Sequence, residues 1–94
     1  MTTKLSQAGF GLNQTRQNVT GSRAVNTLYT NTTGKPIALS IHLSGVATRT
    51  LDIDGVATGP LDSKVYFSEI ILNGQTYKIT SSGSPTIDKW FEVR

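Results

Sequence analysis

The 94-residue chain has no cysteine and only one histidine, and these absences exclude several classes of protein. Without cysteine there are no disulfide bonds, thiolate metal sites or thiol nucleophiles. His42 alone cannot form a multi-histidine metal site within one chain. No apolar run approaches the ~20 residues that a membrane helix needs. The first seven residues carry one positive charge and no apolar block, so we expect neither a signal peptide nor membrane insertion.

Acidic residues are also few, at six against nine lysines and arginines, which gives a net charge of +3 at pH 7. Phosphate binding needs several cations that converge on one groove. The nine basic residues are instead spread along the chain, with no two closer than five positions. The sequence therefore predicts an ordinary solvated surface and no nucleic-acid partner.

What the chain has in abundance is β-branched residues: fourteen Thr, seven Ile and six Val make up 27 of the 94 positions. Such side chains lose rotamer freedom in a helix and pack well on a pleated sheet. The segment 37–43 alternates apolar and polar residues, which is typical of a strand with one buried face. Asp54-Gly55 and Asn73-Gly74 are dipeptides that favour hairpin turns.

These patterns predict an all-β domain over residues 16–94, an antiparallel β-sandwich or jelly-roll-like barrel of seven to eight short strands. The expected strands cover residues 16–20, 24–30, 37–43, 50–54, 56–58, 64–72, 75–80 and 86–94. Residues 1–15 form a separate N-terminal arm. Its isolated apolar residues, Leu5, Phe10 and Leu12, are candidate anchors for docking on a partner, and a flexible tail is the alternative.

The segment 65–72 and the last strand carry apolar side chains on both faces. Val65, Phe67 and Ile71 would lie on one face of their strand, and Tyr66, Ile70 and Leu72 on the other. In an antiparallel sheet one face normally packs on the core and the other is exposed to solvent, so a second apolar face must be buried against another part of the structure. Either the N-terminal arm or another subunit could cover it, and we favour a homo-oligomer.

Residues that could carry catalysis are sparse. No serine lies in a nucleophile elbow, and His42 falls on the polar face of its strand, as a solvated histidine. Asp52 and Asp54 would point to one face, but such pairs are common on strand surfaces beside turns. The residues after Gly55 also fail the calcium-loop pattern. We therefore expect no enzyme activity, no cofactor and no metal.

Several stretches together resemble a known family. They are QNVTGSRA at 17–24, YTNTTGKPI at 29–37, IDGV at 53–56, GQTY at 74–77 and WFEVR at 90–94. In this order they are similar to the C-terminal β-domain of the tail fibres of tailed bacteriophages. The chain departs from that pattern at Arg16, where an aromatic often stands, and over residues 61–72, where the family is often rich in Pro and Gly.

The resemblance implies a structural protein of a phage virion, assembled in the bacterial host, that forms a trimer and binds the host surface, with a cell-surface glycan as a candidate ligand. Residues 1–15 would attach it to other virion proteins. The candidate contacts are Arg49, Tyr66 and Trp90, because Arg and aromatic residues dominate binding hot spots. For Tyr66 and Trp90 the alternative is a place in the core or a subunit interface. The alternative function is decoration of the capsid or collar, because fold does not determine function.

Overall fold

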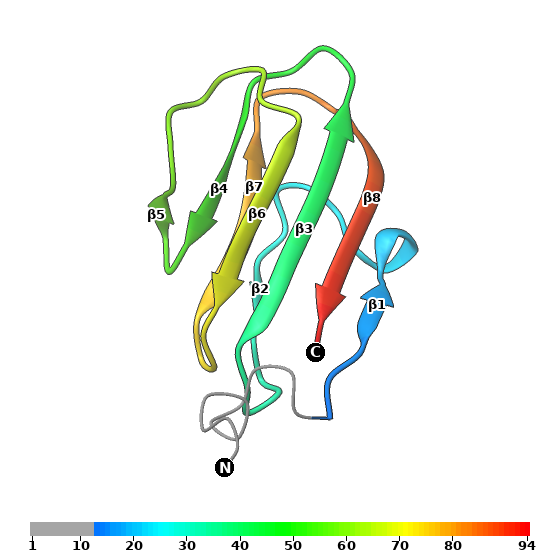
Figure 1. Ribbon diagram of the computed structural model, residues 1–94. Helices are drawn as coiled ribbons and strands as arrows, with labels where there is room; N and C mark the ends of the chain where they lie inside the picture. The colour runs from blue at the N-terminus through cyan, green and yellow to red at the C-terminus, as the bar shows by residue number, and fades with distance from the viewer. Residues whose placement is uncertain (1–12) are drawn as a thin grey trace.

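The computed structural model describes residues 13–94, which form a sandwich of two four-stranded antiparallel sheets (Figure 1). The all-β fold predicted from the sequence is confirmed. The strands are β1 (Arg16–Asn18), β2 (Tyr29–Thr30), β3 (Ile37–Ser44), β4 (Arg49–Ile53), β5 (Val56–Ala57), β6 (Tyr66–Ile71), β7 (Thr76–Ser81) and β8 (Thr86–Val93). The arm residues Leu5, Phe10 and Leu12 lie outside the described residues. Within residues 13–94 no helix is long and apolar enough to cross a membrane.

The strand order identifies the sandwich as a jelly roll. The front sheet in Figure 1 has the order β1-β8-β3-β6, and the back sheet has the order β2-β7-β4-β5. The first strand thus pairs with the last, the second with the seventh, the third with the sixth and the fourth with the fifth. This is the pairing of one long hairpin rolled up into two sheets, the arrangement that defines the jelly roll.

The core lies between the two sheets and follows the alternation seen in the sequence. Strand β3 lies between β8 and β6, and every second side chain along it is buried. The buried apolar residues are Ile37, Leu39, Ile41, Leu43, Leu51, Phe67, Ile71, Tyr77, Ile79 and Trp90. Burying a side chain of this size contributes about 1.5–3 kcal/mol relative to leaving it exposed. This cluster is therefore the main source of stability.

Two predicted hairpin turns are present, with different backbone geometry. Asp54 and Gly55 both have positive φ, at 54° and 79°, as a type I′ turn between β4 and β5 requires. At the turn between β6 and β7 only Gly74 has positive φ, at 88°. The side chain of Asn73 instead accepts a hydrogen bond from the backbone N–H of Gly34 at 2.9 Å. That bond ties the turn to the loop before β3.

The first two strands are shorter than predicted, because local hydrogen bonds compete with the sheet. The Asn18 side chain accepts bonds from the backbone N–H and hydroxyl of Thr20, at 3.1 and 2.7 Å, and the 3-10 turn η1 (Thr20–Ser22) begins there. The strand expected over 24–30 contains only Tyr29 and Thr30. Before it the chain turns at Asn26, whose φ is 57°.

A carboxylate that the sequence did not single out lies fully buried between the sheets. The Oε2 atom of Glu92 accepts hydrogen bonds from the Tyr77 hydroxyl at 2.9 Å, Trp90 Nε1 at 3.1 Å and Arg23 Nε at 3.1 Å. Its Oε1 atom accepts a bond from Arg23 Nη2 at 3.0 Å and lies 3.3 Å from Arg94 Nη1. The cluster links β8 and β7 to the connection between β1 and β2.

The charges in this cluster shift two pKa values. Burial, together with the charge and hydrogen bond of Glu92, raises the pKa of Tyr77 to about 12. Burial alone would lower the pKa of Arg23, but the hydrogen bond and attraction to Glu92 outweigh it and the net shift is upward. Both groups therefore keep their protons at neutral pH, and the guanidinium remains the counter-charge of Glu92.

Candidate binding site at the loop end

Three connections meet at one end of the sandwich, which we call the loop end. They are residues 45–48 between β3 and β4, 58–65 between β5 and β6, and 82–85 between β7 and β8. The C-terminus and the start of β1 lie at the opposite end (Figure 1). The three connections line an open pocket of about 570 Å³, formed by Gly45, Val46, Ala47, Thr48, Ser63, Ser82 and Gly83.

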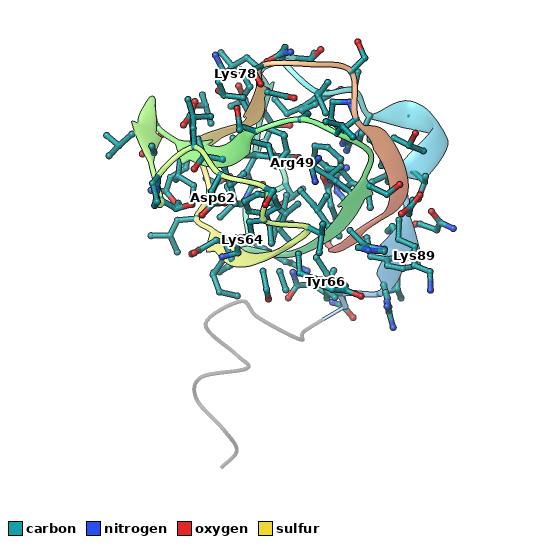
Figure 2. All side chains as sticks on the ribbon, turned by 90° about the horizontal axis from the view of Figure 1, so that it is seen from above. Arg49, Asp62, Lys64, Tyr66, Lys78 and Lys89 are labelled. Atoms are coloured by element: carbon teal, nitrogen blue, oxygen red, sulfur yellow. The ribbon has the colours of Figure 1, made fainter. Side chains whose placement is uncertain are left out.

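Arg49 links two of these connections through hydrogen bonds. Its Nη2 donates to the carbonyl oxygen of Gly45 at 2.7 Å, and its Nη1 donates to that of Lys64 at 3.2 Å. Its backbone N–H donates to the carbonyl of Asp62 at 2.8 Å. Seen from the loop end, Arg49 lies between the two sheets (Figure 2). The planar guanidinium can reach both carbonyls at once, which a flexible ammonium group does less well.

The expectation that Arg49 is an exposed contact is therefore wrong. The residue is 1% exposed, and its charge has no carboxylate among its hydrogen-bond partners in the described residues. The Nε atom has no partner within that part of the chain. Sequence spacing could not reveal this, because the acceptors are main-chain carbonyls of two loops. Arg49 is buried, and its hydrogen bonds shape the loop end.

Further hydrogen bonds fix the walls of the pocket. The hydroxyl groups of Thr48 and Ser82 lie 2.7 Å apart and share a hydrogen bond. The backbone N–H of Ser82 donates to the carbonyl of Thr48 at 2.9 Å, which joins the first and third connections. In the second connection, the Asp62 side chain accepts from the backbone N–H of Lys64 at 2.9 Å. Loops held in this way can present a preformed surface.

A β-bulge in β8 changes which side chains face outward beside the pocket. His42 is opposite Lys89 and Leu43 is opposite Ile87, so Asp88 is the extra residue. In a regular strand Asp88 and Lys89 would point to opposite faces. The bulge instead directs Asp88 to the outer face of the front sheet, where it accepts a hydrogen bond from Ser44 Oγ at 3.1 Å and lies 3.4 Å from His42 Nδ1.

On the same outer face, Tyr66 stacks on His42. The ring centroids are 4.4 Å apart and the planes are inclined by only 11°. The residues are direct neighbours on β6 and β3. Tyr66 is 64% exposed, and its hydroxyl makes no hydrogen bond within the described residues. His42 lies on the polar face of its strand, as predicted, but it is half-buried between Tyr66 and Asp88 and is not a free solvated histidine.

Trp90, unlike Tyr66, is not exposed on the surface. It is fully buried, and its indole N–H donates to Glu92 at 3.1 Å. The expectation of an exposed contact at Trp90 is wrong, and the alternative of a core position is confirmed. The reason is the regular alternation of β8 beyond the bulge, which directs Trp90 and Glu92 inward and Lys89 and Phe91 outward. The Phe91 ring is covered by the guanidinium of Arg16, 4.2 Å from its centroid.

The two aspartates considered for metal binding accept hydrogen bonds from residues of the segment 75–80. Asp54 accepts bonds from the backbone N–H of Thr76 and from Gln75 Nε2, both at 3.0 Å. Asp52 accepts a bond from the hydroxyl of Thr80. Across residues 13–94 there is no group of three or more His, Asp or Glu residues that could hold a metal ion.

The cluster of Ser44, His42, Asp88 and Lys89 was not predicted, although the sequence contains a signal for it. Ile87 and Trp90 are both directed to the core, yet they are three positions apart and not two. Two polar residues between two inward-facing residues break the period of a regular strand, which indicates a bulge. The partner residues on β3 follow only from the pairing of the strands.

Comparison of the chain with protein-family models, with curated proteins and with solved structures found no match. The resemblance to phage tail fibres therefore stays a prediction from the sequence.

Proposed function

We propose that this protein is a non-enzymatic component of a phage virion, a module of the tail-fibre-tip type that binds the host surface through its loop end. The observation that carries the proposal is that the pocket and the C-terminus lie at opposite ends of the sandwich. The pocket is lined by the connections of the loop end, and the exposed Tyr66 begins β6 directly after one of them. The C-terminus and β1 lie toward the other end (Figure 1). A module attached through its terminal end would present the loop end to a target.

The chemistry of the described side chains favours binding over catalysis. Asp52 and Asp54 are engaged in backbone and side-chain hydrogen bonds, and the single histidine is stacked on a tyrosine. A general acid or base needs free access to a substrate proton. The preformed pocket and the exposed aromatic ring are instead typical of a recognition surface.

The terminal half of the outer face supports a homo-oligomer as part of this proposal. Ile70 and Leu72 are 46% and 54% exposed, on or just after β6, which has no neighbouring strand on its outer edge within the described residues. Exposed apolar groups next to an open sheet edge favour association. A trimer packed there, with residues 1–15 bound to another virion protein, would leave the loop ends free.

Immunogold labelling of intact phage particles, with antibody raised against this chain, tests the proposal. We expect gold at the distal tail and inhibition of adsorption by the purified protein. Gold over the head or collar would contradict it and favour a decoration protein, because jelly rolls occur in capsid proteins as well as in lectins. Particles of a phage without this gene are the control.

A further inference from the structure

We propose that two copies of this chain bind each other through the free edges of their β6 strands. The two strands would run antiparallel about a two-fold axis at Ser68, so that the two front sheets join into one sheet of eight strands. Strand β6 ends the front sheet, in the order β1-β8-β3-β6 (Figure 1). The pairing does not depend on the proposed host-surface function, and its two-fold symmetry differs from the trimer that the tail-fibre resemblance implies.

The first argument is the set of backbone groups along this edge. The backbone N–H of Leu43 donates to the carbonyl of Val65 at 2.8 Å, so the odd-numbered residues of β6 direct their N–H and C=O groups toward β3. The groups of Tyr66, Ser68 and Ile70 therefore point to the free edge, which has no neighbouring strand in the described part of the chain. In an antiparallel pair centred on Ser68, each of these residues exchanges two hydrogen bonds with its counterpart on the second copy.

Two features favour the register centred on Ser68. The backbone N–H of Leu72, at the end of the edge, is already bound by Gln75 Oε1 at 2.8 Å, so a pair shifted toward that end would lose hydrogen bonds. A register that placed Glu69 opposite the same residue of the second copy would bring like charges together. In the register centred on Ser68, Glu69 instead lies opposite Phe67 of the second copy.

The second argument is the fit of the exposed apolar side chains. Tyr66 is 64% exposed and Ile70 is 46% exposed, and both lie on the outer face of β6. His42 on β3 covers one face of the Tyr66 ring, with the centroids 4.4 Å apart, so the open face of the ring is turned toward the free edge. In the pair, Ile70 of the second copy lies directly opposite Tyr66 and covers this face. Aromatic and β-branched side chains form favourable cross-strand pairs.

The third argument is charge complementarity on the inner side of the edge. Lys64 Nζ lies 5.4 Å from the centre of the Phe67 ring. Glu69 is exposed and forms no ion pair within the described residues. In the pair, Glu69 of the second copy lies opposite Phe67 and therefore beside the Lys64 ammonium. The two-fold axis produces this contact twice, so each copy supplies one cation and one carboxylate.

The pairing uses the edge of the front sheet and leaves its outer face free. A trimer packed on that face can therefore be added to it, and the whole assembly would then contain six chains. Because the paired strands run antiparallel, the two loop ends lie at opposite ends of the pair, and the loop end of an attached copy still points away from the particle. An edge of six residues offers less surface than a standard interface of about 1,600 Å², so we expect a weak pair with a dissociation constant of about 10–100 µM.

Size-exclusion chromatography with light scattering, from about 5 to 500 µM, tests the pairing with complementary charge variants. Glu69→Lys alone sets Lys64 against a lysine, and Lys64→Glu alone sets Glu69 against a glutamate. Each should weaken the pairing by about tenfold or more, because every change occurs twice. An equal mixture of the two variants should restore pairing, because each lysine then faces a glutamate. Val56→Ala, at an exposed apolar site on the back sheet, should leave the mass unchanged.

Ser68→Pro tests the backbone contact separately. The N–H of Ser68 points away from β3, so proline removes no hydrogen bond of the sheet but removes those at the centre of the pair. We expect this variant to be monomeric with an unchanged circular dichroism spectrum. Ser68→Thr keeps the N–H and should pair as the wild type does.

A mass of two or of six chains supports the pairing. A wild-type chain that stays monomeric at about 500 µM, or that forms only trimers, would overturn it. Pairing that persists in Ser68→Pro and in both single charge variants would also overturn it, because another surface would then be involved. A monomer that still binds bacteria would refute the pairing and leave host attachment intact, whereas a paired chain that does not bind bacteria would refute only the proposed function.

Discussion

Replacement of the buried Glu92 by glutamine should destabilise the fold severely. Glutamine has nearly the same shape, so the change leaves no cavity and removes only the charge and one acceptor. Both carboxylate oxygens face donors: Oε2 accepts from Tyr77, Trp90 and Arg23, and Oε1 accepts a second bond from Arg23. Whichever way the new amide turns, its NH₂ group meets at least one of these donors.

The expected loss is about 3 kcal/mol. Removing one partner of a buried ion pair costs about 3–5 kcal/mol, because the other charge stays buried without compensation. The Arg23 side chain is 12% exposed, so water compensates part of its charge and the lower end of that range applies. A domain of this size has a total stability of about 5–14 kcal/mol at 0.05–0.15 kcal/mol per residue. The variant would therefore lose a fifth to more than half of it.

Urea denaturation followed by tryptophan fluorescence is a suitable assay, because Trp90 donates to the same carboxylate. With a slope of about 2 kcal/mol per M, the midpoint should fall by about 1.5 M. Arg23→Gln and the double variant complete a cycle, in which the double variant should lose clearly less than the sum of the two single losses. A loss below about 0.5 kcal/mol in Glu92→Gln would refute the assignment of this pair as a major buried interaction.

Two further predictions concern Arg49 and Tyr77. Arg49→Ala should lower the free energy of unfolding by about 2–3 kcal/mol, because it opens a cavity and leaves the carbonyls of Gly45 and Lys64 without their donor. Hydrogen exchange should accelerate at residues 45–48 and 62–64. Unchanged exchange there would contradict the role of Arg49. The pKa of Tyr77 is raised from 10.0 to about 12, so the folded state holds its proton more tightly and stability should fall between about pH 10 and 12. Tyr77→Phe should remove that part of the alkaline loss, and an identical pH profile in the two proteins would argue against it.

The sequence was sufficient for the fold class because alternation and turn chemistry are local. Ile37, Leu39 and Ile41 alternate as a half-buried strand must, and Asp54-Gly55 adopts the turn that its residue types favour. The apolar character of both faces of β6 was also apparent, and the structure indeed leaves Ile70 exposed.

The buried polar residues could not be predicted, because their partners are distant in the sequence. Arg23 and Glu92 are 69 positions apart, and the acceptors of Arg49 are main-chain carbonyls. Asn31 follows β2 in a loop, yet its side chain is buried and donates to the carbonyls of Lys35 and Ile71 at 2.7 and 2.9 Å. Only the paired strands bring such groups together. For the same reason Arg49 was expected on the surface.

The candidate site could be predicted from the sequence only in part. Tyr66 was identified from its residue type and from its place on the second apolar face of its strand. Its stacking on His42 depends on the register between β6 and β3, and the position of Asp88 depends on a bulge. The sequence thus identified Tyr66, and only the pairing of the strands places His42 and Asp88 next to one another on the same face.

Binding of the fluorescently labelled chain to intact bacteria that the phage infects tests the central claim most directly. We predict saturable binding by the wild type and by Val56→Ala, and binding about tenfold weaker or more by Tyr66→Thr. Circular dichroism of each variant confirms that the sheet is intact. Absence of binding by the wild type, or equal binding by all three proteins, would contradict the claim that the loop end and Tyr66 recognise the host surface.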